Sequence, residues 1–174
     1  MRVFLMGFMG AGKTTFGNAL AKELKVPFYD LDWFIERRYK KSVSELFAES
    51  GEQAFREIEK DMLHEVGEMD NVVIACGGST PLFFDNMDYM LRKGQTLYLK
   101  VSNVILFKRL KEAKDTRPLI ANKSDEELKE FILSEVERRE KGYLRAEFIF
   151  SGDRLESETE IDETILGVKK LLNL

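Results

Sequence analysis

GFMGAGKT, residues 7–14, has the spacing G-x-x-x-x-G-K-[ST] and directly follows the short apolar run VFLM of residues 3–6. A strand that ends in a glycine-rich turn and opens a helix directs several backbone N–H groups, and the positive end of the helix dipole, toward one point. The helix is indicated by Phe16, Leu20 and Leu24, which recur at a spacing of four residues. The stretch therefore predicts a phosphate loop that binds a nucleotide polyphosphate, and this context argues against the alternative of a chance match.

The residues of the phosphate loop have separable roles. Its glycines allow backbone angles and close approaches that a Cβ atom would block, so that the amides converge on phosphate oxygens. Lys13 brings a mobile positive charge to the β and γ phosphates, and the Thr14 hydroxyl is placed to coordinate Mg²⁺. With Mg²⁺ as cofactor, we expect the phosphates of ATP to be bound by Gly10, Ala11, Gly12, Lys13, Thr14 and Thr15.

Composition indicates one domain and excludes several classes of protein. The chain of 174 residues has the usual size of one domain and is long enough to bury a large core. A single cysteine, Cys76, excludes an internal disulfide framework, and its place in an apolar run indicates an inert buried thiol. The net charge of −4 argues against a nucleic-acid binder, whose phosphate contacts need a basic surface.

No targeting or membrane segment is indicated by the sequence. The first strand is expected to begin at residue 2 or 3, which leaves no room for a signal peptide, and no apolar stretch approaches the ~20 residues that span a membrane. We expect a cytoplasmic protein without membrane or nucleic-acid partners. We also expect a monomer, because no uncommitted apolar stripe is evident.

Strands and helices alternate along the whole chain, which predicts a three-layer α/β/α domain spanning residues 1–174. Short apolar strands separated by helices are typical of a parallel sheet covered on both faces. Two S-x-x-E capping boxes, which begin at Ser42 and Ser124, mark helix starts, and the second helix is expected to end near Gly142. Apolar runs predict strands at residues 3–6, 27–30, 72–76, 96–101 and 148–150.

The charge-rich segment KRLKEAKDTRPLIANKS, residues 108–124, has weak helical periodicity. It predicts a surface loop that works as a lid, at about residues 109–123. Pro118 favours an extended conformation of Arg117, which would then project from the loop. A lid suits a phosphoryl transferase, where closure excludes water. The alternative is an ordinary connection.

Two carboxylates follow the second predicted strand. Asp30 and Asp32 are expected at the carboxyl edge of the sheet, where open α/β sheets bind their ligands. Because side chains alternate along a strand, we expect the side chains of Asp30 and Asp32, which close this strand, to point the same way. One could then hold Mg²⁺ while the other accepts or orients a substrate hydroxyl. The alternative is that one of the two only caps the following helix.

Two arginines are candidates for binding an anionic substrate. Arg56 lies three residues before Glu59 on a predicted helix, so that the two side chains can touch. Glu59 could then fix the Arg56 guanidinium, whose planar fork binds an anionic group. The alternative is an exposed ion pair. Arg139 continues the buried face of its helix, although the helix dipole also favours an arginine there. Gly77 and Gly78 offer backbone that can approach a ligand, and a plain turn is equally consistent with them.

Together these segments resemble the shikimate kinase family over nearly the whole chain. The resemblance implies a P-loop kinase fold with a five-stranded parallel sheet of order 2-3-1-4-5. It implies transfer of the γ-phosphoryl group of ATP to the 3-hydroxyl of shikimate, giving 3-phosphoshikimate in aromatic amino-acid biosynthesis, with a shikimate-binding helical segment at about residues 32–62. The resemblance is carried by GFMGAGKTT (7–15), DLD (30–32), SVSELFAESGEQAFREIE (42–59), VIACGGS (73–79), RPLI (117–120) and R-x-x-x-Y (139–143).

The resemblance further implies roles for individual residues. Asp32 would engage the ring hydroxyls, and Asp32, Lys13 and Arg117 would be the catalytic residues. Asp30 would lie near Mg²⁺ together with Thr14. The nucleotide would also contact Arg117 and, near the carboxyl end, Arg154. Shikimate would be bound by Asp32, Arg56, Gly77, Gly78, Arg139, Phe47 and Phe55.

Some features depart from the family or leave other functions open. Ser79 stands where family members usually have a third glycine, which predicts a narrower approach to the substrate, and the residues after Tyr143 fit the family loosely. The single histidine, His64, is expected in a helix away from every motif, so any proton transfer must come from an aspartate. A gluconate kinase, which shares the loop and the size, and a nucleotide-dependent switch without a small-molecule acceptor are the alternative functions.

Overall fold

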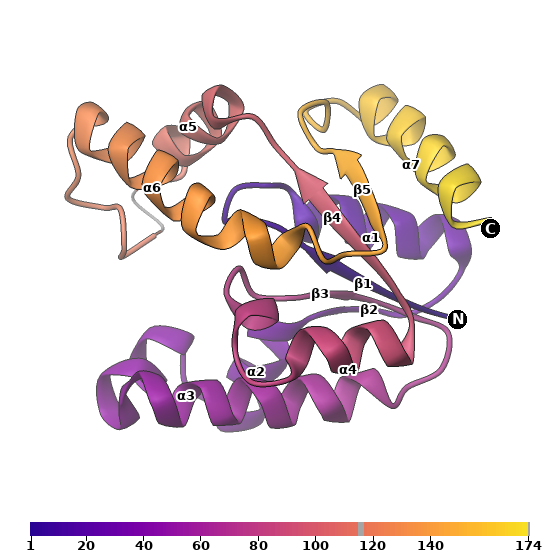
Figure 1. Cartoon of the computed structure of the whole chain (residues 1–174), viewed down its shortest axis with the longest axis horizontal. Helices are drawn as coiled ribbons and strands as arrows, with labels where there is room; N and C mark the ends of the chain where they lie inside the picture. Colours follow the sequence, from indigo (N-terminus) through magenta and orange to yellow (C-terminus); the bar gives the residue numbers. More distant parts are fainter. Residues whose placement is uncertain (115–116, 174) are drawn as a thin grey trace.

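A parallel sheet of five strands runs through the middle of the computed structural model, which describes residues 1–114 and 117–173 (Figure 1). The strand order β2-β3-β1-β4-β5 confirms the predicted order. Each strand agrees with its predicted range to within one residue at either end. The strands are β1 (Arg2–Met6), β2 (Phe28–Asp30), β3 (Val72–Ala75), β4 (Gln95–Lys100) and β5 (Phe148–Ser151).

Helices cover both faces of this sheet. The helices are α1 (Lys13–Leu24), α2 (Leu31–Tyr39), α3 (Val43–Gly67), the short 3-10 helix η1 (Thr80–Leu82), α4 (Asn86–Lys93), α5 (Asn103–Glu112), α6 (Asp125–Tyr143) and α7 (Glu158–Leu172). α1 and α7 lie on one face, whereas α3 and α4 lie on the other (Figure 1). α5 packs against α6 beyond the carboxyl end of β4.

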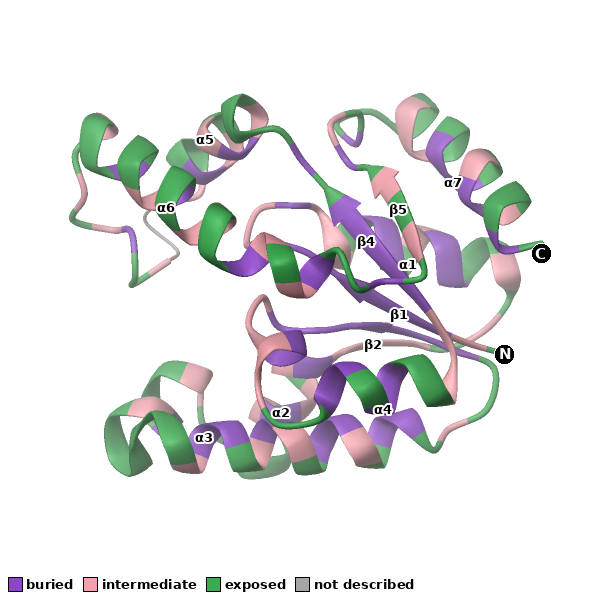
Figure 2. Cartoon of the chain, viewed as in Figure 1, coloured by how far each residue is buried: buried purple, intermediate pink, exposed green. Residues whose placement is uncertain are grey.

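The strands in the centre of the sheet are buried because helices cover them on both sides (Figure 2). Their register decides where the site forms. Leu5 of β1 pairs with Ala75 of β3 and Leu97 of β4, and Ala75 pairs in turn with Asp30 of β2. The chain segments that follow these strands therefore leave the sheet at one edge, where open α/β sheets bind ligands.

Both predicted capping boxes are present. The hydroxyls of Ser42 and Ser124 accept from the third backbone N–H of α3 and α6, and the glutamate at that position reaches back to the serine. A third box, Ser157 with Glu160, begins α7. α6 ends at Tyr143, near Gly142 as predicted, but Gly142 is not its cap, because the C-cap residue is Leu144. Gly142 is needed for another reason: a Cβ atom there would overlap the Leu82 side chain of η1.

The charge-rich segment begins as a helix. Residues 108–112 continue α5, so the expected lid of about residues 109–123 starts inside a helical turn. Residues 115 and 116 of this segment lie outside the described residues. In α3, Gly51 has a φ angle of 78° and interrupts the helical geometry just before the turn that carries Arg56.

Within residues 1–114 and 117–173, no helix combines the length and the apolar character needed to cross a bilayer.

Candidate functional site

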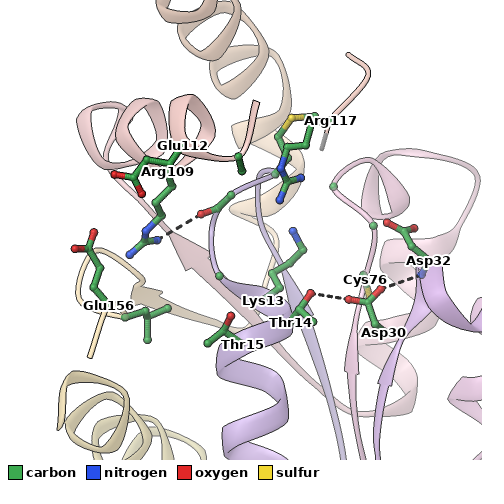
Figure 3. Close-up of a pocket in the computed structure, with 17 residues that line it drawn as sticks. Lys13, Thr14, Thr15, Asp30, Asp32, Cys76, Arg109, Glu112, Arg117 and Glu156 are labelled. Carbon is green, nitrogen blue, oxygen red and sulfur yellow. Dashed lines mark hydrogen bonds between the residues drawn. The ribbon is translucent and has the colours of Figure 1, made fainter. Parts of the chain in front are cut away.

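A cleft of about 640 Å³ opens at the carboxyl edge of the sheet (Figure 3). Its walls come from the phosphate loop and the start of α1, the junction of β2 and α2, the turn after β3, α5, the loop that carries Arg117, and the segment after β5. Of the residues predicted to form the site, those that line the cleft are Gly10, Gly12, Lys13, Thr14, Thr15, Asp30, Asp32, Gly77, Gly78 and Arg117.

The phosphate loop has the backbone geometry that its glycines predict. Gly10 and Gly12 have φ angles of 77° and 94°, which a residue with a side chain adopts only with strain. Among the described residues, no side chain caps the amides in the first turn of α1. These donors are therefore available to an anionic ligand at the positive end of the helix.

Lys13 extends from the start of α1 into the cleft (Figure 3). Its ammonium group donates to the carbonyl oxygens of Gly7 at 2.9 Å and Phe8 at 3.1 Å. Burial lowers the pKa of Lys13, and the carboxylates of Asp32 and Asp30 oppose this shift. The charge is thus poorly hydrated, and phosphate oxygens would be stronger partners than the two carbonyls.

Asp30 joins the phosphate loop to α2. The Thr14 hydroxyl donates to Asp30 Oδ2 at 2.6 Å, and Asp30 Oδ1 accepts from the backbone N–H of Asp32 at 3.1 Å. Asp30 is therefore the N-cap of α2. The prediction that one strand runs through both carboxylates is wrong, because β2 ends at Asp30 and Asp32 lies in the first turn of α2. The helix start nevertheless brings both carboxylates to the cleft.

The Asp32 carboxyl has an unusual protonation equilibrium. Burial raises the pKa of Asp32 to about 6, the negative charges of Asp30 and Glu59 act in the same direction, and Lys13 opposes them. A carboxylate with this pKa is a stronger base than an ordinary aspartate and is still ionised at neutral pH. It is the group in the cleft best suited to receive a proton from a hydroxyl.

Arg56 and Glu59 form a buried ion pair on α3. Arg56 Nη1 lies 2.8 Å from Glu59 Oε2, and the two side chains are only 11% and 1% exposed, which excludes the exposed pair considered as the alternative. The Thr80 hydroxyl donates to the other Glu59 oxygen at 2.6 Å. Three rings surround the guanidinium, with centroids 5.3, 5.4 and 4.4 Å from Cζ; they belong to Phe47, Phe55 and Phe83.

Arg139 is buried on α6, as its helical position predicted. Glu135, one turn earlier, accepts from Arg139 Nε at 3.0 Å and from Nη2 at 2.5 Å. The Phe8 ring lies over the guanidinium, with its centroid 5.2 Å from Cζ. At the end of α6, the Tyr143 hydroxyl donates to the Gly78 carbonyl. α6 is thereby attached to the glycine turn after β3.

Neither arginine lines the cleft, but both adjoin the glycine turn that does. A Cβ atom on Gly77 would lie 2.7 Å from Glu59 Oε1 and 3.2 Å from Asp32 Oδ1, and one on Gly78 would lie 3.5 Å from Arg139 Nη1. The acid that holds Arg56, the Asp32 carboxylate and the Arg139 guanidinium therefore converge on two residues. The rings of Phe47 and Phe55 pack against the Arg56 guanidinium and do not line the cleft.

Arg117 enters the cleft from the loop after α5, on the side of Lys13 (Figure 3). Burial lowers the pKa of Arg117, against the effect of the Asp32 carboxylate. Within the described residues its Nε is buried without a hydrogen-bond partner. A poorly hydrated cation with a free donor fits an anionic ligand at this place.

The structure places Arg109 in the cleft and Arg154 outside it, although the family resemblance favoured Arg154. Arg154, predicted to contact the nucleotide, does not line the cleft; its largely exposed side chain pairs with Glu160 and Glu163. Arg109 lines the cleft and donates to carbonyl oxygens of the phosphate loop at 3.4 Å and of Asp153 at 3.0 Å. Its position in a charged stretch gave no signal of this, because neighbouring lysines and arginines look equivalent in sequence.

Three remaining residues are explained by their surroundings. Ser79 has φ and ψ angles of −106° and −8°, which any residue adopts, so the backbone does not require glycine there. Cys76 lines the cleft, but burial raises the pKa of its thiol and keeps it protonated. His64 stacks on Tyr89 with ring centroids 3.9 Å apart and does not line the cleft.

Comparison with known proteins identifies the relatives of this chain. The family model described as shikimate kinase matches residues 9–169. A shikimate kinase of Bacteroides fragilis is 53% identical over 174 residues, which cover 100% of this chain and 97% of the relative. The crystal structure of a shikimate kinase from Bacteroides thetaiotaomicron has a TM-score of 0.98 at 50% identity and covers 100% of this chain and 99% of that one.

Two more distant structures differ in how much they share with this chain. A shikimate kinase from Acinetobacter baumannii, solved in complex with shikimate, has a TM-score of 0.83 at 26% identity and covers 99% of this chain and 93% of that one. A gluconokinase from Sinorhizobium meliloti has a TM-score of 0.56 at 16% identity over 99% and 93% of the two chains, a likeness of fold alone. The chain therefore belongs to the shikimate kinase family of ATP-dependent phosphotransferases that use an alcohol group as acceptor.

Proposed function

We propose that Asp32 receives the proton of the shikimate 3-hydroxyl as this oxygen attacks the γ-phosphorus of ATP, giving 3-phosphoshikimate and ADP. The observation that carries this assignment is the raised pKa of Asp32, about 6, in a cleft that also contains Lys13 and Arg117. Phosphoryl transfer passes through a loose transition state, so that the protein acts mainly by positioning and by charge stabilisation.

The nucleotide is assigned to the phosphate loop. Backbone amides of Gly10, Ala11 and Gly12, together with Thr15, would hold the phosphates at the start of α1. Lys13 and Arg117 would offset the charge of the migrating group from two sides of the cleft. The segment of about residues 109–123, which begins in the last turn of α5, would act as a lid, and the position of Arg117 in the cleft supports this.

Shikimate is assigned to the side of the cleft near the glycine turn. Arg56 and Arg139 would bind its carboxylate, and backbone of Gly77 and Gly78 would approach its ring. Phe47 and Phe55 would form an apolar wall behind Arg56. We therefore propose a shikimate-binding helical segment at about residues 32–62, to which Gly77, Gly78 and Arg139 are added from elsewhere in the chain. The whole of residues 1–174 forms one proposed domain.

The family generally uses a divalent metal ion, and we propose Mg²⁺ for this chain. Thr14 Oγ1 and Asp30 Oδ2 are hard oxygen ligands beside the phosphate loop, 2.6 Å apart. Within the described part of the chain, no cluster of three or more His, Cys, Asp or Glu residues could hold a metal. This fits Mg²⁺, which takes one or two protein ligands and completes its shell with phosphates and water. When bound, the ion supplies charge that offsets the phosphates.

We propose a cytoplasmic monomer that binds ATP and shikimate and neither nucleic acid nor membrane. The use of ATP and the single buried thiol support this location. The net charge of −4 supports the absence of a nucleic-acid partner.

A coupled assay with ATP and Mg²⁺ tests the proposal. Shikimate should be phosphorylated, whereas gluconate and nucleoside monophosphates should give at most background turnover. Equal turnover of gluconate would contradict the assignment of the two arginines. ATP binding without turnover of any acceptor would instead favour the nucleotide-dependent switch.

A further inference from the structure

The two buried arginines at the glycine turn are each held by an acid, but only one acid belongs to the segments that resemble the family. Glu59, which holds Arg56, closes the segment of residues 42–59. Glu135, which holds Arg139, lies outside those segments, and neither the cleft nor the proposed function accounts for it.

Glu135 occupies one edge of the Arg139 guanidinium. A single oxygen, Glu135 Oε2, accepts from Arg139 Nε at 3.0 Å and from Nη2 at 2.5 Å. A guanidinium carries five N–H donors in a planar arrangement with two forks. The fork of Nε and Nη2 is therefore taken, and the fork of Nη1 and Nη2 is left for a second anion.

The second fork adjoins the proposed acceptor site. A Cβ atom on Gly78 would lie 3.5 Å from Arg139 Nη1, so this nitrogen is on the side of the glycine turn. The Phe8 ring covers a face of the guanidinium, with its centroid 5.2 Å from Cζ. The Tyr143 hydroxyl donates to the Gly78 carbonyl, so that α6, which carries Arg139, is also attached to this turn.

Glu135 is itself held by a second arginine. Arg138 donates from Nε to Glu135 Oε1 at 3.1 Å and from Nη2 to Oε2 at 2.8 Å. The Arg138 side chain is 61% exposed, so it holds Glu135 from the solvent side. Hydrogen bonds from Arg138 and Arg139 lower the pKa of Glu135, and the acid therefore stays ionised at neutral pH.

We infer that Glu135 is a positioning residue for acceptor binding, which fixes the Nε edge of Arg139 so that its second fork faces the carboxylate of shikimate beside Gly78. The inference rests on the proposed function, in which Arg139 binds that carboxylate. Glu135 acts through Arg139 and touches no substrate.

Glu135→Gln tests the inference by removing the charge while keeping the shape. The KM for shikimate should rise about 3- to 10-fold, as expected when a hydrogen bond between charged groups is weakened, with kcat and the KM for ATP nearly unchanged. The KM for the methyl ester of shikimate, which lacks the carboxylate charge, should not move. Glu137→Gln removes the same charge from an exposed position on α6 and is the matched control, with no change expected.

Arg139→Lys separates failure of the inference from failure of the proposed function. If Arg139→Lys reduces the preference for shikimate over its methyl ester while Glu135→Gln does not, the inference is wrong and the proposed function stands. If neither variant changes this preference, Arg139 does not bind the carboxylate and both are wrong. In the double variant, Glu135→Gln should add no further loss.

Arg138→Gln keeps the inference testable if Glu135→Gln does not fold. Arg138 is exposed and lies outside the cleft, so its replacement should leave the fold intact. The freed Glu135 should hold Arg139 less firmly, and the KM for shikimate should rise about 2- to 3-fold, with the KM for the ester unchanged. Equal changes for both acceptors would overturn the inference.

Discussion

The proposed nucleotide side and the proposed acceptor side of the cleft are built in different ways. The nucleotide side is largely one run of residues, 10–15, in which backbone geometry and a helix start place the donors. The acceptor side is assembled from α2, α3, α6 and the turn after β3, and it depends on buried side chains held by acids. The first arrangement is local in sequence, whereas the second exists only when distant helices are packed together.

This difference has an energetic consequence. Backbone amides at a helix start need no other side chain to hold them in position. A buried guanidinium must be paired, because an unpaired buried charge costs several kcal/mol. Substitutions on the acceptor side should therefore alter the binding or turnover of the acceptor while ATP binding is kept.

Asp32→Asn should give the largest effect. We expect kcat to fall about 10²- to 10⁴-fold, since an amide cannot accept the hydroxyl proton, while the KM for ATP changes little. Steady-state kinetics with each substrate varied in turn gives both values. Equal losses in turnover and in ATP affinity would contradict the division between the two sides.

Thermal unfolding of Asp32→Asn provides a control for folding. The folded-state pKa of about 6 lies above the ordinary value of 3.8, so the folded state binds more protons between these values and loses stability as the pH rises through them. At neutral pH the variant should unfold at a higher temperature than the parent chain. A lower unfolding temperature would mean that damage to the fold explains the loss of activity.

Arg56→Lys should raise the KM for shikimate about 10- to 100-fold, because a point charge cannot replace a planar fork held by Glu59 within three aromatic rings. The KM for ATP should stay within about twofold, as P-loop contacts are untouched. Steady-state kinetics with each substrate varied in turn is the measurement. An unchanged KM for shikimate would show that Arg56 does not bind the acceptor.

The pH profile should report the ionisation of Asp32. If the ionised form of Asp32 accepts the proton, as proposed, kcat/KM for shikimate should fall about tenfold per pH unit below about 6, the pKa of Asp32 in the free enzyme. Asp32→Asn should lose this acid limb, and a limb that persists in the variant would belong to another group.

Arg109→Ala should give the smallest of these effects. It tests whether Arg109, and not Arg154, contributes to the binding of ATP. We expect the KM for ATP to rise about 3- to 10-fold, since Arg109 ties the phosphate loop to the segment after β5 by neutral-acceptor hydrogen bonds. Arg154→Ala, at an exposed position outside the cleft, is the matched control and should change it less than twofold. The reverse order would restore the sequence-based preference for Arg154.

Much of the fold could be predicted because its signals are local. The strand ranges, the capping boxes at Ser42 and Ser124 and the phosphate loop each depend on residues close in sequence. The errors have a common cause. Asp30 and Asp32 lie on either side of a strand end that propensity cannot resolve. Gly142 was interpreted as a helix cap, whereas the structure needs glycine there because of Leu82, which is sixty residues earlier in the chain.

The candidate site, like the fold, could be predicted only where its signals are local in sequence. Sequence spacing made Arg56 and Arg139 candidates, but it could not distinguish an exposed ion pair from a buried one, since burial depends on what packs against the helix. Arg109 and Glu135 were missed because they lie among other charges, and only their contacts set them apart.

The amino-acid sequence by itself determined the α/β class, the strand order implied by family resemblance, the phosphate loop and the kind of reaction, because these depend on short motifs whose backbone geometry is intrinsic. Only the tertiary structure decided that Asp32, Glu59 and Arg139 meet at Gly77 and Gly78, with Arg139 Nη1 on the side of the turn. Only the tertiary structure also buries Asp32 near Asp30 and Glu59, which raises the pKa of Asp32. The physical reason is that desolvation and charge coupling act through space, between groups that the chain brings together only when the sheet and its helices are packed.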